Sequence, residues 1–209
     1  FSDPIMRALF SGAAGLIPVL AVATVYDPEL PPAEQQFDQG LAKLISTLGR
    51  IFLPFTLIVA VIYTLYIPAN FMRPFEQRDV LIVYNAMLFA VMGLIVIATP
   101  LNADDVSEKW QKWLRMGLVA LAILTVLVSL YALSATVYRT NLGGLTMNRL
   151  TIIGWNTINI ALLCLYLYRQ LQGGLTQWVE SSHWAFRIGM AAYAVWTMAV
   201  ILAMPLLFG

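Results

Sequence analysis

Long windows without a charged residue constrain this chain more than any other feature of its sequence. Six such windows lie between consecutive Asp, Glu, Lys or Arg residues, at 8–26, 51–72, 80–103, 116–138, 150–168 and 188–209. A helix needs about 20 apolar residues to cross the hydrocarbon core of a bilayer, and each window is long enough to do so. None shows the strict alternation of an outer-membrane barrel strand. The windows therefore predict an all-α fold, a polytopic transmembrane helical bundle of six spans.

The composition agrees with a membrane protein and excludes several other classes. Only 11% of the residues are charged and 60% are hydrophobic, whereas a soluble domain carries about 25% charged residues. This chain lacks both the polar surface of a soluble domain and the low hydrophobicity of a disordered one. Its 12 Lys and Arg residues barely exceed its 11 Asp and Glu residues, so we expect no nucleic-acid partner. The lipid bilayer is the partner that the composition indicates.

The windows follow one another without a long polar insertion, so we interpret residues 1–209 as a single transmembrane domain. The sequence begins at Phe1 and ends at Gly209, directly after an apolar window that has no polar tail. We therefore expect the chain to be a segment of a longer membrane protein.

The connections between windows fall alternately on two sides of the membrane. Side A holds the N-terminus, 73–79 and 139–149, and side B holds 27–50, 104–115 and 169–187. The positive-inside rule counts Lys and Arg in short loops, and side A carries five of them against seven on side B. These numbers alone do not orient the chain. The shorter loops of side A, whose cations are all arginine, favour a cytoplasmic side A.

Side B carries the amphipathic segments and most of the tryptophans. Helical spacing of apolar residues predicts interfacial helical turns at 32–48, running into the second span, and at 105–114. Four of the six tryptophans also lie on side B: Trp110, Trp113, Trp178 and Trp184. One interpretation is an ordinary aromatic belt at the headgroup level. The other is a docking platform for further membrane-protein chains.

The charged and nucleophilic residues give no pattern typical of catalysis. All 11 acids lie outside the windows, so a proton relay inside the membrane has no carboxylate. His183 is the only histidine and Cys164 the only cysteine, and we interpret Cys164 as a small apolar packing residue. The sequence therefore predicts no catalytic residue, no metal ligand and no cofactor, and we expect the protein not to be an enzyme.

Two neutral polar residues of the fifth window, together with the arginine that precedes this window, form a possible site. Arg149, Asn156 and Asn159 are spaced at i, i+7 and i+10, which places them on about one helix face. Asn85 of the third window and Tyr193 of the sixth are among the residues that could meet this polar stripe. The stripe could make hydrogen bonds between helices, or it could line a polar cavity or substrate path.

The connection between the fourth and fifth windows has the densest local signal, YRTNLGGLTMNRL at 138–150. Glycine adopts a left-handed conformation at little cost, so Gly143 or Gly144 is expected at positive φ after the helix. Thr146 is a good N-cap for the next helix. Arg149 is expected to reach headgroups or a carbonyl at a helix end.

This segment resembles the Tyr-Arg…Gly-Leu-Thr-x-x-Arg signature of a multi-pass bacterial membrane family called domain of unknown function 4153. The matching residues are Tyr138, Arg139, Gly144, Leu145, Thr146 and Arg149. The preceding IFLPFTLIVAVIYTLYI helix is also similar to that family, and the resemblance covers roughly 37–169. Gly143 replaces the aromatic residue that usually precedes the glycine. The resemblance implies an integral membrane protein with additional spans, which we place in the bacterial inner (cytoplasmic) membrane, and it implies no established activity.

Two functions remain open from the sequence. The first is a non-catalytic scaffold or accessory subunit of a membrane complex, favoured by the lack of catalytic groups and by the amphipathic surface of side B. The alternative is a transporter or permease module for a neutral or polar small solute, favoured by the polar stripe. A hydrated cavity that reaches Asn156 would favour transport, whereas a dry bundle would favour the scaffold.

Overall fold

The protein is an all-helical bundle. The computed structural model describes residue 12 and residues 16–35, 40–102, 106–174 and 177–208, and these residues form helices and no strand. The five long helices are α2 (Gly40–Tyr66), α4 (Arg78–Ala98), α5 (Glu108–Gly143), α6 (Met147–Gln172) and α7 (Trp178–Leu202). The short ones are η1 (Pro32–Glu34), η3 (Pro68–Asn70), α3 (Arg73–Glu76) and α8 (Met204–Phe208). The predicted all-α class is confirmed.

Five of the six predicted spans correspond to described helices. α2, α4, α5, α6 and the α7–α8 stretch are long and apolar enough to cross a membrane, with mean hydropathies from 1.7 to 2.6. The chain is therefore a multi-pass integral membrane protein. The window at 8–26 is helical over residues 16–23, but residues 1–11 and 13–15 lie outside the described residues. That span stays a prediction.

All the long helices except α4 are longer than the charge-free windows that predicted them. α7 begins at Trp178 instead of residue 188, and α5 begins at Glu108 instead of residue 116. The interfacial turns expected at 32–48 and 105–114 are largely the first turns of α2 and α5, apart from η1 and from 36–39 and 105, which lie outside the described residues. A charge limits how much of a helix can lie in hydrocarbon. It does not end the helix, because Lys, Arg and Glu are good helix formers.

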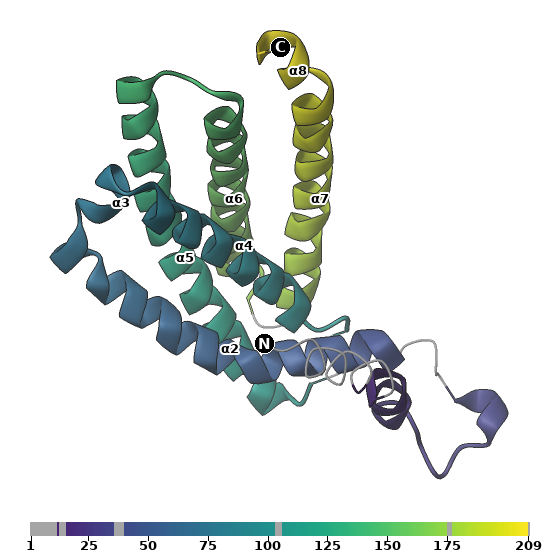
Figure 1. Cartoon of the computed structure of the whole chain (residues 1–209). Coiled ribbons are helices and arrows are strands. Elements are labelled where there is room, and N and C mark those ends of the chain that lie inside the picture. The colour runs from purple at the N-terminus through teal and green to yellow at the C-terminus, as the bar shows by residue number, and fades with distance from the viewer. Residues whose placement is uncertain (1–11, 13–15, 36–39, 103–105, 175–176, 209) are drawn as a thin grey trace.

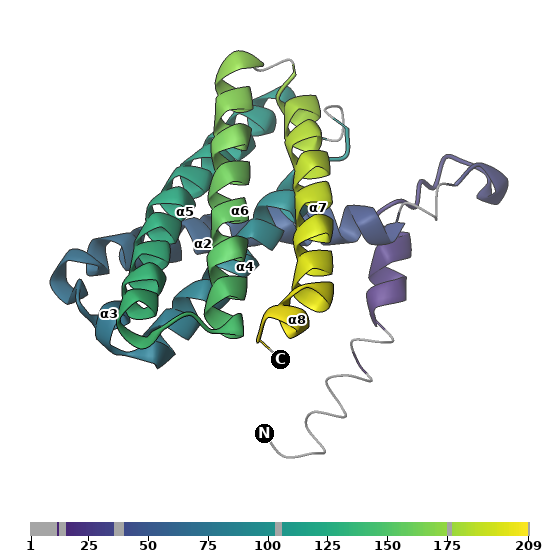
Figure 2. The same ribbon diagram turned by 90° about the horizontal axis from the view of Figure 1, so that it is seen from above.

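α5 is the centre of the bundle. It packs against α2, α4 and α6, and α6 in turn packs against α7. In Figure 1 and Figure 2, α5, α6 and α7 stand side by side, while α2 and α4 run obliquely across them. The segment of residues 27–35 extends away from the bundle on the side where α2 begins (Figure 1).

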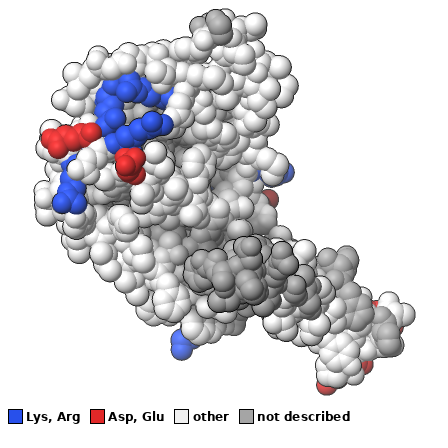
Figure 3. All heavy atoms as spheres, viewed as in Figure 1, with Lys and Arg blue, Asp and Glu red and all other residues white. Residues whose placement is uncertain are grey.

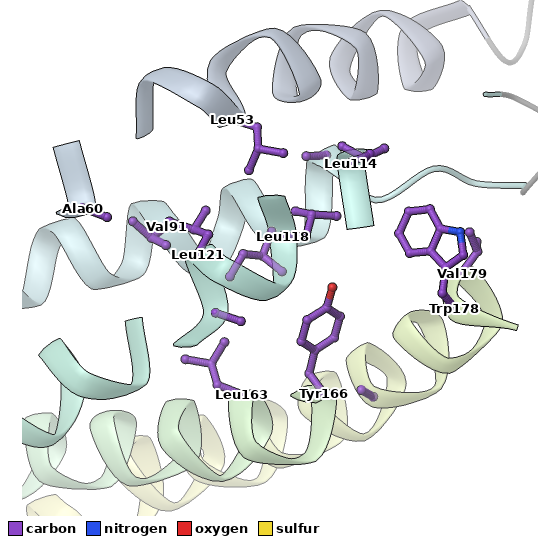
Figure 4. Packing of buried hydrophobic residues seen from close by; sticks show 14 residues of the cluster. Leu53, Ala60, Val91, Leu114, Leu118, Leu121, Leu163, Tyr166, Trp178 and Val179 are labelled. Atoms are coloured by element: carbon purple, nitrogen blue, oxygen red, sulfur yellow. The ribbon is translucent and has the colours of Figure 1, made fainter. Parts of the chain in front are cut away.

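Small and branched apolar side chains on α5 make this central position possible. Leu118, Leu121 and Ala122 are fully buried, and the two leucines lie between Leu53 of α2 and Leu163 of α6 (Figure 4). Lipid gives helices no hydrophobic driving force to associate, so their association depends on close van der Waals packing of side chains such as these.

The contact between α6 and α7 depends on a glycine, because the ring of Trp196 on α7 lies where a side chain on Gly154 of α6 would be. A larger residue at position 154 therefore requires a shift of the Trp196 ring or of α7.

Candidate functional site

The predicted polar stripe forms two hydrogen-bonded pairs between helices. The Asn156 Nδ2 atom of α6 donates to Asn85 Oδ1 of α4 at 2.7 Å, and Asn85 Nδ2 donates to the Leu81 carbonyl at 2.8 Å. The Tyr193 hydroxyl of α7 donates to Asn159 Oδ1. Both α6 asparagines are buried, with 1% and 0% exposure. Asn85 and Tyr193 are two of the residues that the sequence placed near the stripe.

Arg149 does not belong to this polar group. Its Nη1 atom donates to the Gly144 carbonyl at 2.6 Å, about two helical turns from Asn156. A long side chain in the first turn of a helix can reach back to the carbonyls of the preceding connection, which leaves the core to the two asparagines. Arg149 therefore takes no part in the interhelical pairs, which use the two inner residues of the predicted stripe.

Several buried polar atoms have no hydrogen-bond partner in the described part of the chain. Among them are Asn159 Nδ2 and Ser129 Oγ. Among the cavities of the described structure are two of about 200 Å³ each, one between α4, α6 and α7 and one beside α2 and α4. Tyr193 lines the first cavity, which is otherwise almost entirely apolar, and neither Asn156 nor Asn159 lines either one.

The turn between α5 and α6 has the expected geometry. Gly144 has φ = 78° directly after the last residue of α5, and Thr146 Oγ1 accepts a hydrogen bond from the Arg149 amide at 3.4 Å. Leu145 is 51% exposed. With Arg149 bound to the Gly144 carbonyl, all three predictions for this turn are confirmed.

Tyr138 and Arg139, the first two residues of the same motif, contact α3 on side A. Arg139 Nη1 donates to the carbonyls of Glu76 at 2.9 Å and Phe75 at 3.4 Å, which are the exposed carbonyl end of α3. The ring of Tyr138 packs edge-on against Phe75 at 5.5 Å between centroids. Tyr138 and Arg139 therefore fix the α2–α4 connection to α5.

The four tryptophans of the predicted docking platform do not form one surface. Trp110 and Trp113 are 67% and 63% exposed. Trp178 is fully buried, and Trp184 lies under the guanidinium of Arg169, whose Cζ is 3.8 Å from the ring centroid. Only Trp110 and Trp113 are therefore free to meet a partner, because the first turn of α7 directs Trp178 inward.

Sequence reasoning missed a buried polar network on side B, centred on Gln170. Arg115 Nε donates to Gln170 Oε1 at 3.1 Å, and Arg115 Nη2 donates to the Gln170 carbonyl. Gln170 Nε2 donates to the Trp178 carbonyl at 3.0 Å and to Ser182 Oγ at 2.7 Å. The Gln170 amide thus uses its carbonyl oxygen and both N–H groups. These four residues, named here the side B network, join α5, α6 and α7.

The single histidine and cysteine have ordinary positions. His183 Nε2 lies 2.9 Å from the Pro100 carbonyl and links α7 to the α4–α5 connection. Cys164 is exposed on α6, so its expected role in core packing is wrong. Within the described residues, no three His, Cys, Asp or Glu side chains lie close enough together to hold a metal ion.

One sequence signal could have indicated the side B network. Gln170 and Ser182 are neutral residues among charged neighbours, and uncharged polar side chains are the ones that a membrane helix can bury at moderate cost.

Comparison with known proteins adds no assignment, because no family model, curated protein or solved structure matches the chain. The resemblance to domain of unknown function 4153 stays a prediction from the motif.

Proposed function

We propose that this integral membrane protein is a non-catalytic scaffold or accessory subunit that holds other chains in the bacterial inner membrane. The observation that supports this proposal best is the use of the interior polar side chains. Asn156 is bonded to Asn85, and Tyr193 to Asn159, each pair across two helices. In this proposal the polar stripe is part of the packing of the bundle.

The positions of the cavities agree with this interpretation. A path for a polar solute needs polar groups along an open space, and neither interior asparagine lines either of the two cavities described above. Interhelical hydrogen bonds of this kind contribute about 0.6 kcal/mol each in a membrane. Such bonds are typical of a bundle whose role depends on its shape.

The start of α5 offers a surface for a partner chain. Trp110 and Trp113 are both more than 60% exposed, and the neighbouring Lys109 and Lys112 are exposed as well. Aromatic residues are enriched in protein interfaces relative to other surfaces. In the proposed function, this surface contacts the polar part of another membrane protein.

A permease for a neutral solute is the second candidate. It is favoured by buried polar atoms that have no hydrogen-bond partner in the described structure, among them Asn159 Nδ2 and Ser129 Oγ. Such atoms would be free to bind a solute or water.

Flux measurements distinguish the two functions. The full-length protein is reconstituted in liposomes, and the entry of glycerol and urea is followed by light scattering. We expect glycerol and urea to enter liposomes that contain the wild type or Asn156→Leu at the same rate as they enter liposomes without protein. Thr157→Leu is the matched control, because Thr157 is exposed one residue away. Rapid flux that Asn156→Leu abolishes and Thr157→Leu preserves would establish the permease instead.

The partner surface is tested in native membranes. A photo-crosslinking amino acid at Trp113 is expected to give one discrete protein adduct. The same amino acid at Leu65, which is 73% exposed near the other end of the bundle, is expected to give only lipid adducts. Equal labelling from both positions would contradict a dedicated surface at Trp113.

A further inference from the structure

A cavity on side A lies where the end of α2 meets the start of α4. Its volume is about 200 Å³, and its lining includes Tyr63, Tyr66, Asn70, Arg73, Val83 and Tyr84. It is the more polar of the two cavities, with three tyrosines, one amide and one guanidinium. The described residues that line it include no carboxylate.

Arg73 supplies the positive charge of this cavity. Its side chain is exposed, and its Nη1 atom donates a long hydrogen bond of 3.5 Å to the Tyr66 hydroxyl. A guanidinium carries five N–H donors, so most of those on Arg73 remain available for an anion. Its planar fork binds two oxygens of a phosphate group at once.

The surroundings of the cavity place it at the headgroup level of a bilayer. α2 ends at Tyr66 and α4 begins at Arg78, so the cavity lies at the ends of two spans. Figure 3 shows Lys and Arg atoms gathered where Figure 1 places α3 and the end of α5, with fewer Asp and Glu atoms among them. Val83 of α4 lines the cavity and is 53% exposed, so it adds an apolar surface beside the polar groups.

We propose that this cavity binds the headgroup of an anionic phospholipid. Arg73 binds the phosphate, and Tyr66 and Asn70 bind the remaining polar groups of the headgroup. An acyl chain then lies along Val83 toward the interior of the membrane. Basic pockets between helix ends are a general means of binding anionic lipids, and the polar rim beside an apolar wall matches both parts of such a lipid.

Native mass spectrometry of the full-length protein in detergent tests this proposal, with phosphatidylglycerol and phosphatidylcholine added in equal amounts. We expect preferential retention of phosphatidylglycerol. Arg73→Gln should weaken that retention about tenfold, as expected for a lost charge-assisted contact. Arg187→Gln is the matched control, because Arg187 is exposed on α7 and does not line the cavity, and it should retain the lipid as the wild type does.

Two further arms make each outcome decisive. Val83→Trp fills the cavity without changing its charge and should also lower retention, which keeps the test valid if Arg73→Gln does not fold. Full retention in Val83→Trp would overturn the cavity as the site. Unchanged retention in folded Arg73→Gln would overturn the role of Arg73. Displacement of the lipid by millimolar inorganic phosphate would assign the site to a free anion and overturn the lipid.

Discussion

The two ends of the bundle use arginine and polar side chains in opposite ways. On side A, Arg139 and Arg149 reach backbone carbonyls of nearby connections, in contacts that are partly or fully exposed. On side B, Arg115 reaches Gln170, which is 1% exposed and bonds in turn to α7. Side A therefore fixes the shape of its turns, whereas side B fixes how three helices pack. A buried polar group that loses its partner costs more than an exposed one, so the two ends should differ sharply when they are mutated.

The largest effect is expected from Gln170→Leu. This change leaves the Arg115 guanidinium with one acceptor fewer and removes two hydrogen bonds to α7, and we expect a loss of about 3 kcal/mol in unfolding free energy. Steric trapping in detergent micelles measures it. Gln172→Leu is the matched control, because Gln172 is exposed and, among the described residues, bonds to Tyr168 on its own helix. Equal losses in the two variants would remove the contrast between buried and exposed contacts.

The next effect belongs to side A and depends on the backbone. Gly144→Val places a β-branched residue at φ = 78°, which should cost about 1.5 kcal/mol. A lower thermal midpoint in detergent shows this loss. Gly93→Val is the comparison, because Gly93 lies inside α4 with open space around it, and its midpoint should stay unchanged. A Gly144→Val midpoint equal to that of the wild type would contradict the role of the turn.

A smaller loss is expected from Arg139→Gln. The variant loses the contact to the Phe75 and Glu76 carbonyls, which should cost about 1 kcal/mol because these carbonyls stay accessible to water. Hydrogen exchange should then become faster at 73–77 and remain unchanged in α7. The exposed Arg78 serves as control through Arg78→Gln. Faster exchange throughout the bundle would show that side A also governs helix packing.

The smallest effect is expected in the middle of the membrane. Asn156→Leu removes one bond to the buried Asn85 and should cost about 0.6 kcal/mol, the average for an interhelical hydrogen bond in a bilayer. This average is small despite the burial, because the unfolded chain in the membrane also finds hydrogen-bond partners. The unfolding free energy, measured in mixed micelles beside the control variant Thr157→Leu, resolves a change of this size. A loss as large as that of Gln170→Leu would mean that depth, and not connectivity, determines the cost.

The sequence predicts local properties of this protein better than its packing. The cost of placing a charge in hydrocarbon depends on the residue itself, so the windows between charges located the spans. The turn at Gly144 and Thr146 was predictable for the same reason, because its conformation depends on adjacent residues. Trp178 and Gln170 were expected in a side B loop, yet both are buried. Their burial depends on which helix covers them, and the sequence alone does not contain that information.

The sparse packing of α7 has a consequence for the order in which the bundle comes apart. Only 11% of its apolar window is buried inside the molecule, against 44% for α5. α7 packs mainly against α6, whereas α5 has three large helix neighbours. A mechanical force applied at the C-terminal end should therefore extract α7 first, by breaking one helix interface. The bonds from Gln170 to Trp178 and Ser182 are then the last to resist, because they lie at the far end of the helix from the point of pulling.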